Sequence, residues 1–143
     1  MPKVFIQAPS GQVFKALSDL TRHAKWAAHD ITIEAGQEGP PAVGNTYISK
    51  HKGGTPDQLT VTEVVPNERF RFHAVMPRGM GWEFDFTMTA RPEAGGTVVT
   101  RDAKVTKFPI FMLPGRLLLA PLMGSIYDRK FLRIMKADLE APA

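Results

Sequence analysis

Cysteine is absent from this sequence of 143 residues, which excludes disulfide frameworks, thiolate zinc sites, iron–sulfur clusters and a cysteine nucleophile. The four histidines show none of the usual metal-ligand spacings, so neither a metal nor another cofactor is expected. No serine stands in a nucleophile-elbow context, and the two glycine pairs fall in expected hairpin turns instead of preceding a helix. A serine hydrolase and a phosphate-binding loop are therefore not expected either.

The chain also has little sequence of the kind that targets or crosses a membrane. Residues 1–5 lead directly into a strand-like pattern with no apolar signal-peptide region, so we expect a cytoplasmic location. The most apolar stretch, residues 108–126, carries only the charge of Arg116, but three prolines interrupt it, which disfavours a membrane-spanning helix. Burial in the core, a lid over a cavity entrance, a dimer contact and a membrane-docking surface are all compatible with this stretch.

Charge is modest and is spread along the chain. Eighteen basic and fourteen acidic residues give a net charge of +4, but the basic residues lie on separate predicted elements and accompany no nucleic-acid-binding motif. We expect no nucleic-acid partner, whereas transient contact with an anionic membrane is compatible with this charge. The hydrophobic fraction of 43% is that of an ordinary globular protein, and the length fits a single domain over residues 1–143.

The hydrophobic periodicity predicts the α+β class. Residues 82–90 give the clearest strand, because aromatic and methionine side chains alternate there with polar ones. Further strands are expected over residues 3–7, 31–34, 45–51, 58–65, 69–75 and 97–106. Their short connections favour an antiparallel meander, and two short helices, over about residues 8–19 and 21–27, separate the first strand from the second.

A long helix is expected near the end of the chain, from Pro114 or Pro121 to Glu140, and it is amphipathic from Ile126 onward. The predicted apolar arc comprises Tyr127, Phe131, Ile134 and Met135. The predicted polar arc comprises Asp128, Arg129, Arg133, Lys136 and Glu140. A helix with one buried face after a run of strands needs a sheet on which to pack.

Several loose motifs in this order resemble those of the START-like superfamily (SRPBCC proteins, which include the birch-pollen-allergen family). These motifs are Ile6-Gln7-Ala8-Pro9, Val13-Phe14, Leu17-Ser18-Asp19, Trp26, Val61-Thr62-Glu63-Val64-Val65-Pro66, Gly95-Gly96-Thr97, Val99-Thr100, Leu132, Met135-Lys136 and Leu139-Glu140. The branch that the chain resembles most is the bacterial polyketide cyclase/dehydrase and lipid-transport group. The resemblance implies a helix-grip fold, in which a curved antiparallel sheet of about seven strands wraps around the long C-terminal helix.

The resemblance further implies a cavity between sheet and helix that holds apolar ligands. A twisted sheet touches a straight helix well along only part of its length, which also leaves room for a cavity, although a solid core is the alternative. The expected lining residues are Trp26, Tyr47, His51, Phe70, Phe72, Trp82, Phe84, Phe86, Met88, Val99, Arg101, Met112, Leu118, Leu122, Met123, Tyr127 and Phe131. Methionine suits such a lining because its flexible thioether chain adapts to varied shapes.

Three polar residues are candidates for chemistry in this cavity. By the alternation that the family shows, Arg101 points inward, where a buried guanidinium needs an anionic partner; alternatively it reaches solvent near the end of its strand. Tyr47 and His51 lie four residues apart on one strand and hence on one face, so they are the candidates for acid–base catalysis, unless that face is exposed.

We therefore expect a protein that binds and carries a hydrophobic small molecule such as a lipid, a fatty acid or a polyketide-like compound. The first alternative is an enzyme of the polyketide cyclase or dehydratase type, with a cavity acid or base. The second is an interaction protein that docks a partner, a membrane or a second copy of itself through residues 108–126.

Overall fold

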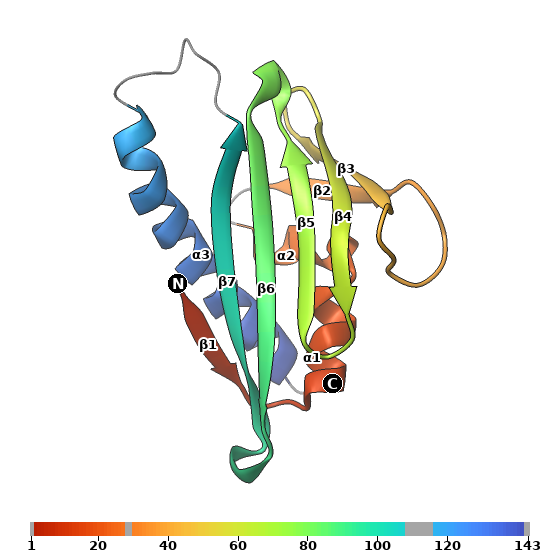
Figure 1. Cartoon of the computed structure of the whole chain (residues 1–143), viewed down its shortest axis with the longest axis vertical. Helices are drawn as coiled ribbons and strands as arrows, with labels where there is room; N and C mark the ends of the chain where they lie inside the picture. The colour runs from red at the N-terminus through yellow and green to blue at the C-terminus, as the bar shows by residue number, and fades with distance from the viewer. Residues whose placement is uncertain (1, 28–29, 108–115, 142–143) are drawn as a thin grey trace.

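A computed structural model describes residues 2–27, 30–107 and 116–141, with side chains except those of Arg78 and residues 116–125. Seven strands form one antiparallel sheet in the order β1-β7-β6-β5-β4-β3-β2, which confirms the predicted meander (Figure 1). The strands are β1 (Lys3–Ile6), β2 (Ile31–Ala35), β3 (Thr46–His51), β4 (Asp57–Val65), β5 (Arg69–Val75), β6 (Gly81–Arg91) and β7 (Gly96–Lys107). The first strand pairs with the last, as the register Val4↔Val99 shows.

The helices cover one face of this sheet. Between β1 and β2 lie α1 (Ser10–Leu17), the 3-10 turn η1 (Leu20–Arg22) and α2 (His23–Trp26), where two short helices were predicted. The long helix α3 (Arg116–Glu140) runs obliquely behind the sheet and packs against β1, β7 and α2 (Figure 1). Short 3-10 turns η2 (Pro77–Gly79) and η3 (Pro92–Ala94) connect β5 to β6 and β6 to β7. The predicted α+β helix-grip fold is confirmed.

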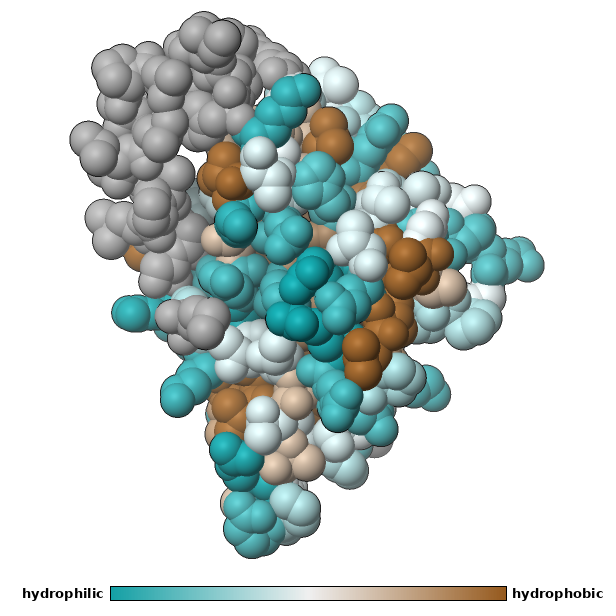
Figure 2. All heavy atoms as spheres, viewed as in Figure 1, coloured by the Kyte–Doolittle hydropathy of each residue, from teal (hydrophilic) through white to brown (hydrophobic). Residues whose placement is uncertain are grey.

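The alternation in β6 sorts its side chains between two environments. Phe86 and Met88 are buried on the inner face, which looks toward the helices. Glu83 and Asp85 lie on the outer face, which Figure 2 shows to be mainly hydrophilic over β5, β6 and β7. A sheet with one packed and one solvated face stabilises the fold chiefly through its inner side chains.

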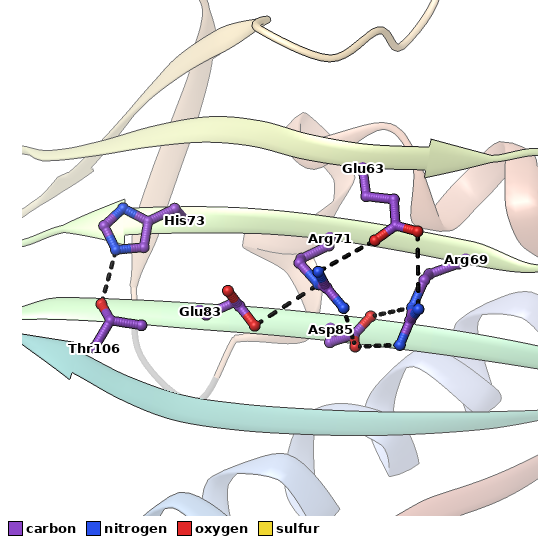
Figure 3. A network of polar contacts seen from close by, with 7 residues as sticks. All are labelled: Glu63, Arg69, Arg71, His73, Glu83, Asp85 and Thr106. Atoms are coloured by element: carbon purple, nitrogen blue, oxygen red, sulfur yellow. Dashed lines mark hydrogen bonds and ion pairs between the residues drawn. The ribbon is translucent and has the colours of Figure 1, made fainter.

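A network of charged side chains covers the outer face of β4, β5 and β6 (Figure 3). Asp85 accepts hydrogen bonds from Nε and Nη2 of Arg69, at 3.1 and 3.0 Å, and from Nη2 of Arg71 at 3.1 Å. Arg71 also lies 3.2 Å from Glu63 and 3.7 Å from Glu83. Because the network is partly solvated and has several members, each single contact contributes modestly to stability.

The predicted arcs of α3 are wrong at their N-terminal end. Asp128, expected on the polar arc, is only 5% exposed, and Tyr127, expected on the apolar arc, is 43% exposed. Of the other residues on the predicted apolar arc, Phe131 and Met135 are buried, and Ile134 is partly buried against the core. The buried stripe of α3 is therefore Asp128, Phe131, Leu132, Met135 and Leu139. This spacing is that of one helix face, with a carboxylate in a position that usually holds an apolar residue.

Candidate functional site

A pocket of about 780 Å³ lies between the inner face of the sheet and the helices α2 and α3. Strands β2 to β7 all contribute to it, together with η2. Its lining comprises His23, Ala27, Asp30, Ile31, Ile33, Ser49, His51, Lys52, Asp57, Leu59, Phe72, Ala74, Met76, Pro77, Met80, Trp82, Phe84, Arg101, Ala103, Tyr127, Asp128 and Phe131. The volume falls in the range of about 300–1,000 Å³ that is typical of small-molecule sites.

Three stacked aromatic rings form the sheet wall of the pocket. The ring centroids of Phe72 and Phe84 lie 5.1 Å apart with an interplanar angle of 26°. Those of Trp82 and Phe84 lie 6.0 Å apart at 14°. The register pairs Phe72 with Phe84 and Ala74 with Trp82, so the rings follow two neighbouring strands. Such a surface offers a flat apolar contact area to a ligand.

A buried ion pair joins β7 to α3 at this pocket. Nη1 of Arg101 lies 2.8 Å from Oδ1 of Asp128, and the two side chains are only 11% and 6% exposed. The guanidinium carbon of Arg101 is 4.1 Å from the ring centroid of Phe131 and 5.0 Å from that of Phe84. Arg101 therefore points inward, as the resemblance implied, and its anionic partner belongs to the protein itself.

Burial acts on both members of this pair. It lowers the pKa of Arg101 to about 10, whereas the negative charge of Asp128 acts to raise that pKa. Burial also raises the pKa of Asp128, and the Arg101 charge partly reverses this effect. Since Arg101 remains protonated at neutral pH, the pocket presents a guanidinium whose charge is balanced by one carboxylate.

His23 lies beside this pair and is neutral at physiological pH. Its ring contacts those of Trp26, Phe86 and Phe131, with centroids 5.1, 5.5 and 5.3 Å away. Nε2 lies 2.7 Å from the carbonyl oxygen of Leu17, which can only accept, so Nε2 carries the proton. Desolvation by burial lowers the pKa of His23 to about 3. His23 is therefore a weak base, and its Nδ1 is a hydrogen-bond acceptor.

A second histidine, His51, borders the pocket at the β3–β4 hairpin. Its Nε2 lies 3.9 Å from Oδ1 of Asp57, and burial raises the pKa of Asp57. Gly54 packs against the imidazole so closely that a Cβ there would meet its Cε1 at 2.1 Å. Tyr47 shares the inner face of β3 but is not part of the pocket lining; it is buried in the core, and burial raises its pKa.

The structure divides the predicted lining residues into three groups. Those that border the pocket are His51, Phe72, Trp82, Phe84, Arg101, Tyr127 and Phe131. Those that are buried in the core without bordering it are Trp26, Tyr47, Phe70, Phe86, Met88 and Val99. Met112 lies outside the described residues, as do the side chains of Leu118, Leu122 and Met123 in α3. The aromatic row of β6 thus passes from pocket wall at Trp82 and Phe84 to solid core at Phe86 and Met88.

Sequence reasoning missed six polar residues of the pocket lining, namely His23, Asp30, Ser49, Lys52, Asp57 and Asp128. Two of them carried a signal in their spacing. His23 precedes the buried Trp26 by three residues in α2, and Asp128 precedes Phe131 and Leu132 by three and four residues in α3. Spacings of three and four residues place side chains on one helix face, so both residues could have been assigned to the buried side.

Two general features bear on the kind of site this is. In the part of the chain that the structure describes, no three side chains of metal-binding type come together. Over the same residues, no helix is both long enough and apolar enough to cross a bilayer. The segment 108–126 was expected to be buried in the core or to form a lid, a dimer contact or a membrane surface; its residues 108–115 lie outside the described residues, as do the side chains of residues 116–125.

The sheet, the gripped helix and the pocket between them define a helix-grip protein. The chain belongs to the polyketide cyclase/dehydrase and lipid transport family, whose sequence profile matches residues 3–140, and the resemblance inferred from the sequence is thereby confirmed. Membership in this family supports a ligand-binding or cyclase-type role. Among curated proteins, none matches the chain significantly.

Solved structures share this fold at low sequence identity. Protein MLL2253 from Mesorhizobium loti has a TM-score of 0.68 and 16% identity, over 96% of this chain and 96% of that one. The Aha1 dimer from Colwellia psychrerythraea has a TM-score of 0.63 and 22% identity, over 97% of this chain and 93% of that one. DynU16, from the dynemicin biosynthetic locus, has a TM-score of 0.63 and 20% identity over 96% of this chain, which spans 46% of DynU16. These identities show likeness of fold alone.

Proposed function

We propose that the protein binds a hydrophobic small molecule in the pocket between the sheet and α3. The observation that carries this proposal is the stacked wall of Phe72, Trp82 and Phe84 along a pocket of about 780 Å³. Removing apolar surface from water contributes about 25 cal/mol per Å², so an apolar ligand gains affinity in proportion to the area that it covers. Family membership supports the same role, because lipid transport requires a site of this kind.

The fluorescent probe N-phenyl-1-naphthylamine tests the proposal. It has no oxygen and no charge, so its binding depends on the apolar surface of the pocket. We expect a saturable rise in fluorescence with one probe per chain. The variant Ala103→Phe places a ring in the pocket opposite Phe84, with which Ala103 pairs, and is expected to weaken probe binding at least tenfold.

The matched control is Lys104→Phe, which adds the same ring to the exposed outer side of β7. We expect this variant to bind the probe within about twofold of the parent protein. Failure of the parent protein to bind the probe, or equal binding by Ala103→Phe and the parent, would contradict the proposal.

A second function, acid–base catalysis of the cyclase or dehydratase type, is favoured by one specific observation. His51 borders the pocket and lies 3.9 Å from Asp57, which is the arrangement of a base with an orienting carboxylate. In a dehydration, His51 would remove the proton next to a thioester carbonyl and then deliver that proton to the 3-hydroxyl group, which leaves as water.

The 3-hydroxybutyryl thioester of N-acetylcysteamine is a direct probe of this reaction, since its product, the unsaturated thioester, absorbs in the ultraviolet. The catalytic hypothesis predicts turnover that His51→Gln reduces at least a hundredfold. The exposed Lys50, whose Nζ lies 3.0 Å from Glu34, supplies the control Lys50→Gln with unchanged turnover. Equal rates for His51→Gln and the parent protein would exclude His51 as the base.

A further inference from the structure

Three buried side-chain nitrogens have no hydrogen-bond partner within the described part of the protein, namely Nε of Arg71, Nε1 of Trp82 and Nε of Arg101. The first is accounted for, because the Glu83 carboxylate lies 3.7 Å away on the outer face. The other two belong to residues that line the pocket. A buried donor without a partner destabilises a protein, so two of them in one pocket wall call for a physical reason.

The two donors lie on the same part of the wall. The ring of Trp82 stacks on that of Phe84 at 6.0 Å, and the guanidinium carbon of Arg101 lies 5.0 Å from the same Phe84 ring. Phe84 therefore connects the indole on β6 to the guanidinium on β7.

Neither of these two nitrogens has an acceptor within hydrogen-bond distance among the described residues. A guanidinium has five N–H donors, and among the described residues Arg101 has one ion pair, between its Nη1 and Asp128. Trp82 can only donate. Both unpartnered groups are donors, so the group that completes the site is an acceptor.

We propose that Arg101 and Trp82 select the ligand of the pocket, and that this ligand is an apolar molecule bearing an oxygen acceptor, either a carbonyl or a carboxylate. The inference rests on the proposed function and adds the chemical class of the ligand to it. The apolar part of the molecule covers Phe72 and Phe84, and its oxygen accepts from the guanidinium and the indole. A cationic amphiphile of the same length has no acceptor for either donor.

Competition against bound N-phenyl-1-naphthylamine measures this selectivity with three eleven-carbon compounds, namely undecanoate, 2-undecanone and undecylamine. The readout is the affinity ratio of each oxygen compound to undecylamine, so changes in the pocket that affect all ligands alike cancel. Because hydrogen bonds to charged groups are the stronger ones, we expect a ratio of at least ten for undecanoate in the parent protein. The ratio for 2-undecanone shows whether a neutral carbonyl suffices.

The double variant Arg101→Met/Asp128→Leu removes the pair without leaving either charge alone, and its undecanoate ratio is expected to fall to about one. Trp82→Phe keeps an aromatic ring and removes only the N–H; it is expected to lower the ratio about three- to tenfold without lowering the thermal midpoint. If the double variant does not fold, Trp82→Phe alone still tests the inference. Lys104→Met, on the outer face, controls for general attraction of anions and is expected to leave the ratio unchanged.

Two results would overturn the inference: a ratio near one for both oxygen compounds in the parent protein, or an undiminished ratio in Trp82→Phe and in the double variant. Either can occur while the probe itself still binds, which would leave the proposed binding function intact. Absence of probe binding would instead remove the binding function, and the selectivity would fall with it.

Discussion

Arginines and their carboxylate partners lie on both faces of the sheet, but their exposure to solvent differs between the two faces. On the outer face, Asp85 receives hydrogen bonds from two arginines that are 38% and 27% exposed at their side chains. On the inner face, Arg101 and Asp128 are 11% and 6% exposed and lie among phenyl rings. The outer group is a shared, solvated network, whereas the inner group is one pair in an apolar environment.

This difference separates stability from function. Solvated pairs keep part of their hydration and contribute little each, but cost little to form. A buried pair gives up hydration that its mutual attraction does not fully restore, and apolar residues of similar volume are often as stabilising or more so. The outer network is therefore explained by its position on a solvated surface. The inner pair is explained by the pocket that it borders.

The largest effect is expected from breaking the inner pair on one side only. Asp128→Asn keeps the shape of the side chain but leaves the buried Arg101 charge without its carboxylate. The expected loss is about 3–5 kcal/mol in the free energy of unfolding, measured by urea denaturation at pH 7. A loss below 1 kcal/mol would show that Arg101 is hydrated in spite of its burial.

An intermediate effect is expected from the neutral His23, and it depends on pH. Burial lowers the folded-state pKa to about 3 from 6.5, so below pH 6.5 the unfolded chain binds a proton that the folded chain refuses. The stability of the parent protein should thus fall with pH through this window, by about 2 kcal/mol from pH 7 to pH 5 on account of His23 alone.

His23→Gln removes this titration while its amide N–H can still donate to the Leu17 carbonyl. Between pH 6.5 and pH 4, the unfolding free energy of this variant is expected to fall less steeply with decreasing pH than that of the parent. The difference between the two slopes corresponds to about one bound proton. The raised pKa values of Asp57 and Asp128 act in both proteins and cancel in this difference. Identical slopes would mean that His23 is protonated or accessible in the folded protein.

The smallest effect is expected from the matched change on the outer face. Glu83→Gln removes one carboxylate that lies 3.7 Å from Arg71, and Asp85 and Glu63 remain beside that arginine. The free energy of unfolding is expected to change by no more than about 0.5 kcal/mol, and less in 1 M NaCl, in the same urea assay. A loss comparable to that of Asp128→Asn would remove the contrast between the two faces.

Much of the fold was predictable because it depends on alternation along single strands. The β6 pattern fixed which residues face the helices, and the short turns favoured neighbouring antiparallel strands. The site was less predictable, because alternation gives the face of a residue but not its depth. Phe84 and Phe86 share one face of β6, yet only Phe84 borders the pocket, since its position along the strand decides whether a helix covers it.

The polar part of the site was the least predictable. Asp128 was assigned to solvent because of its charge, and its burial depends on Arg101, which is 27 positions earlier in the chain and on another element. His51 and Tyr47 illustrate the same limit, since they share a face of β3 but only His51 reaches the pocket. The burial and position of these side chains depend on contacts between distant elements. The periodicity within one element carries no information about such contacts.

Thermal unfolding with and without undecanoate, in the parent protein and in Arg101→Met/Asp128→Leu, decides whether the buried pair serves recognition or stability. We predict that the double variant is at least as stable as the parent without the acid, because its apolar side chains replace a costly pair. We also predict that undecanoate at about a hundred times its Kd for the parent raises the Tm of the parent by roughly 5–10 °C and that of the double variant by no more than about half as much. A double variant that melts well below the parent, with both proteins gaining equally from undecanoate, would show that the pair serves stability and not recognition.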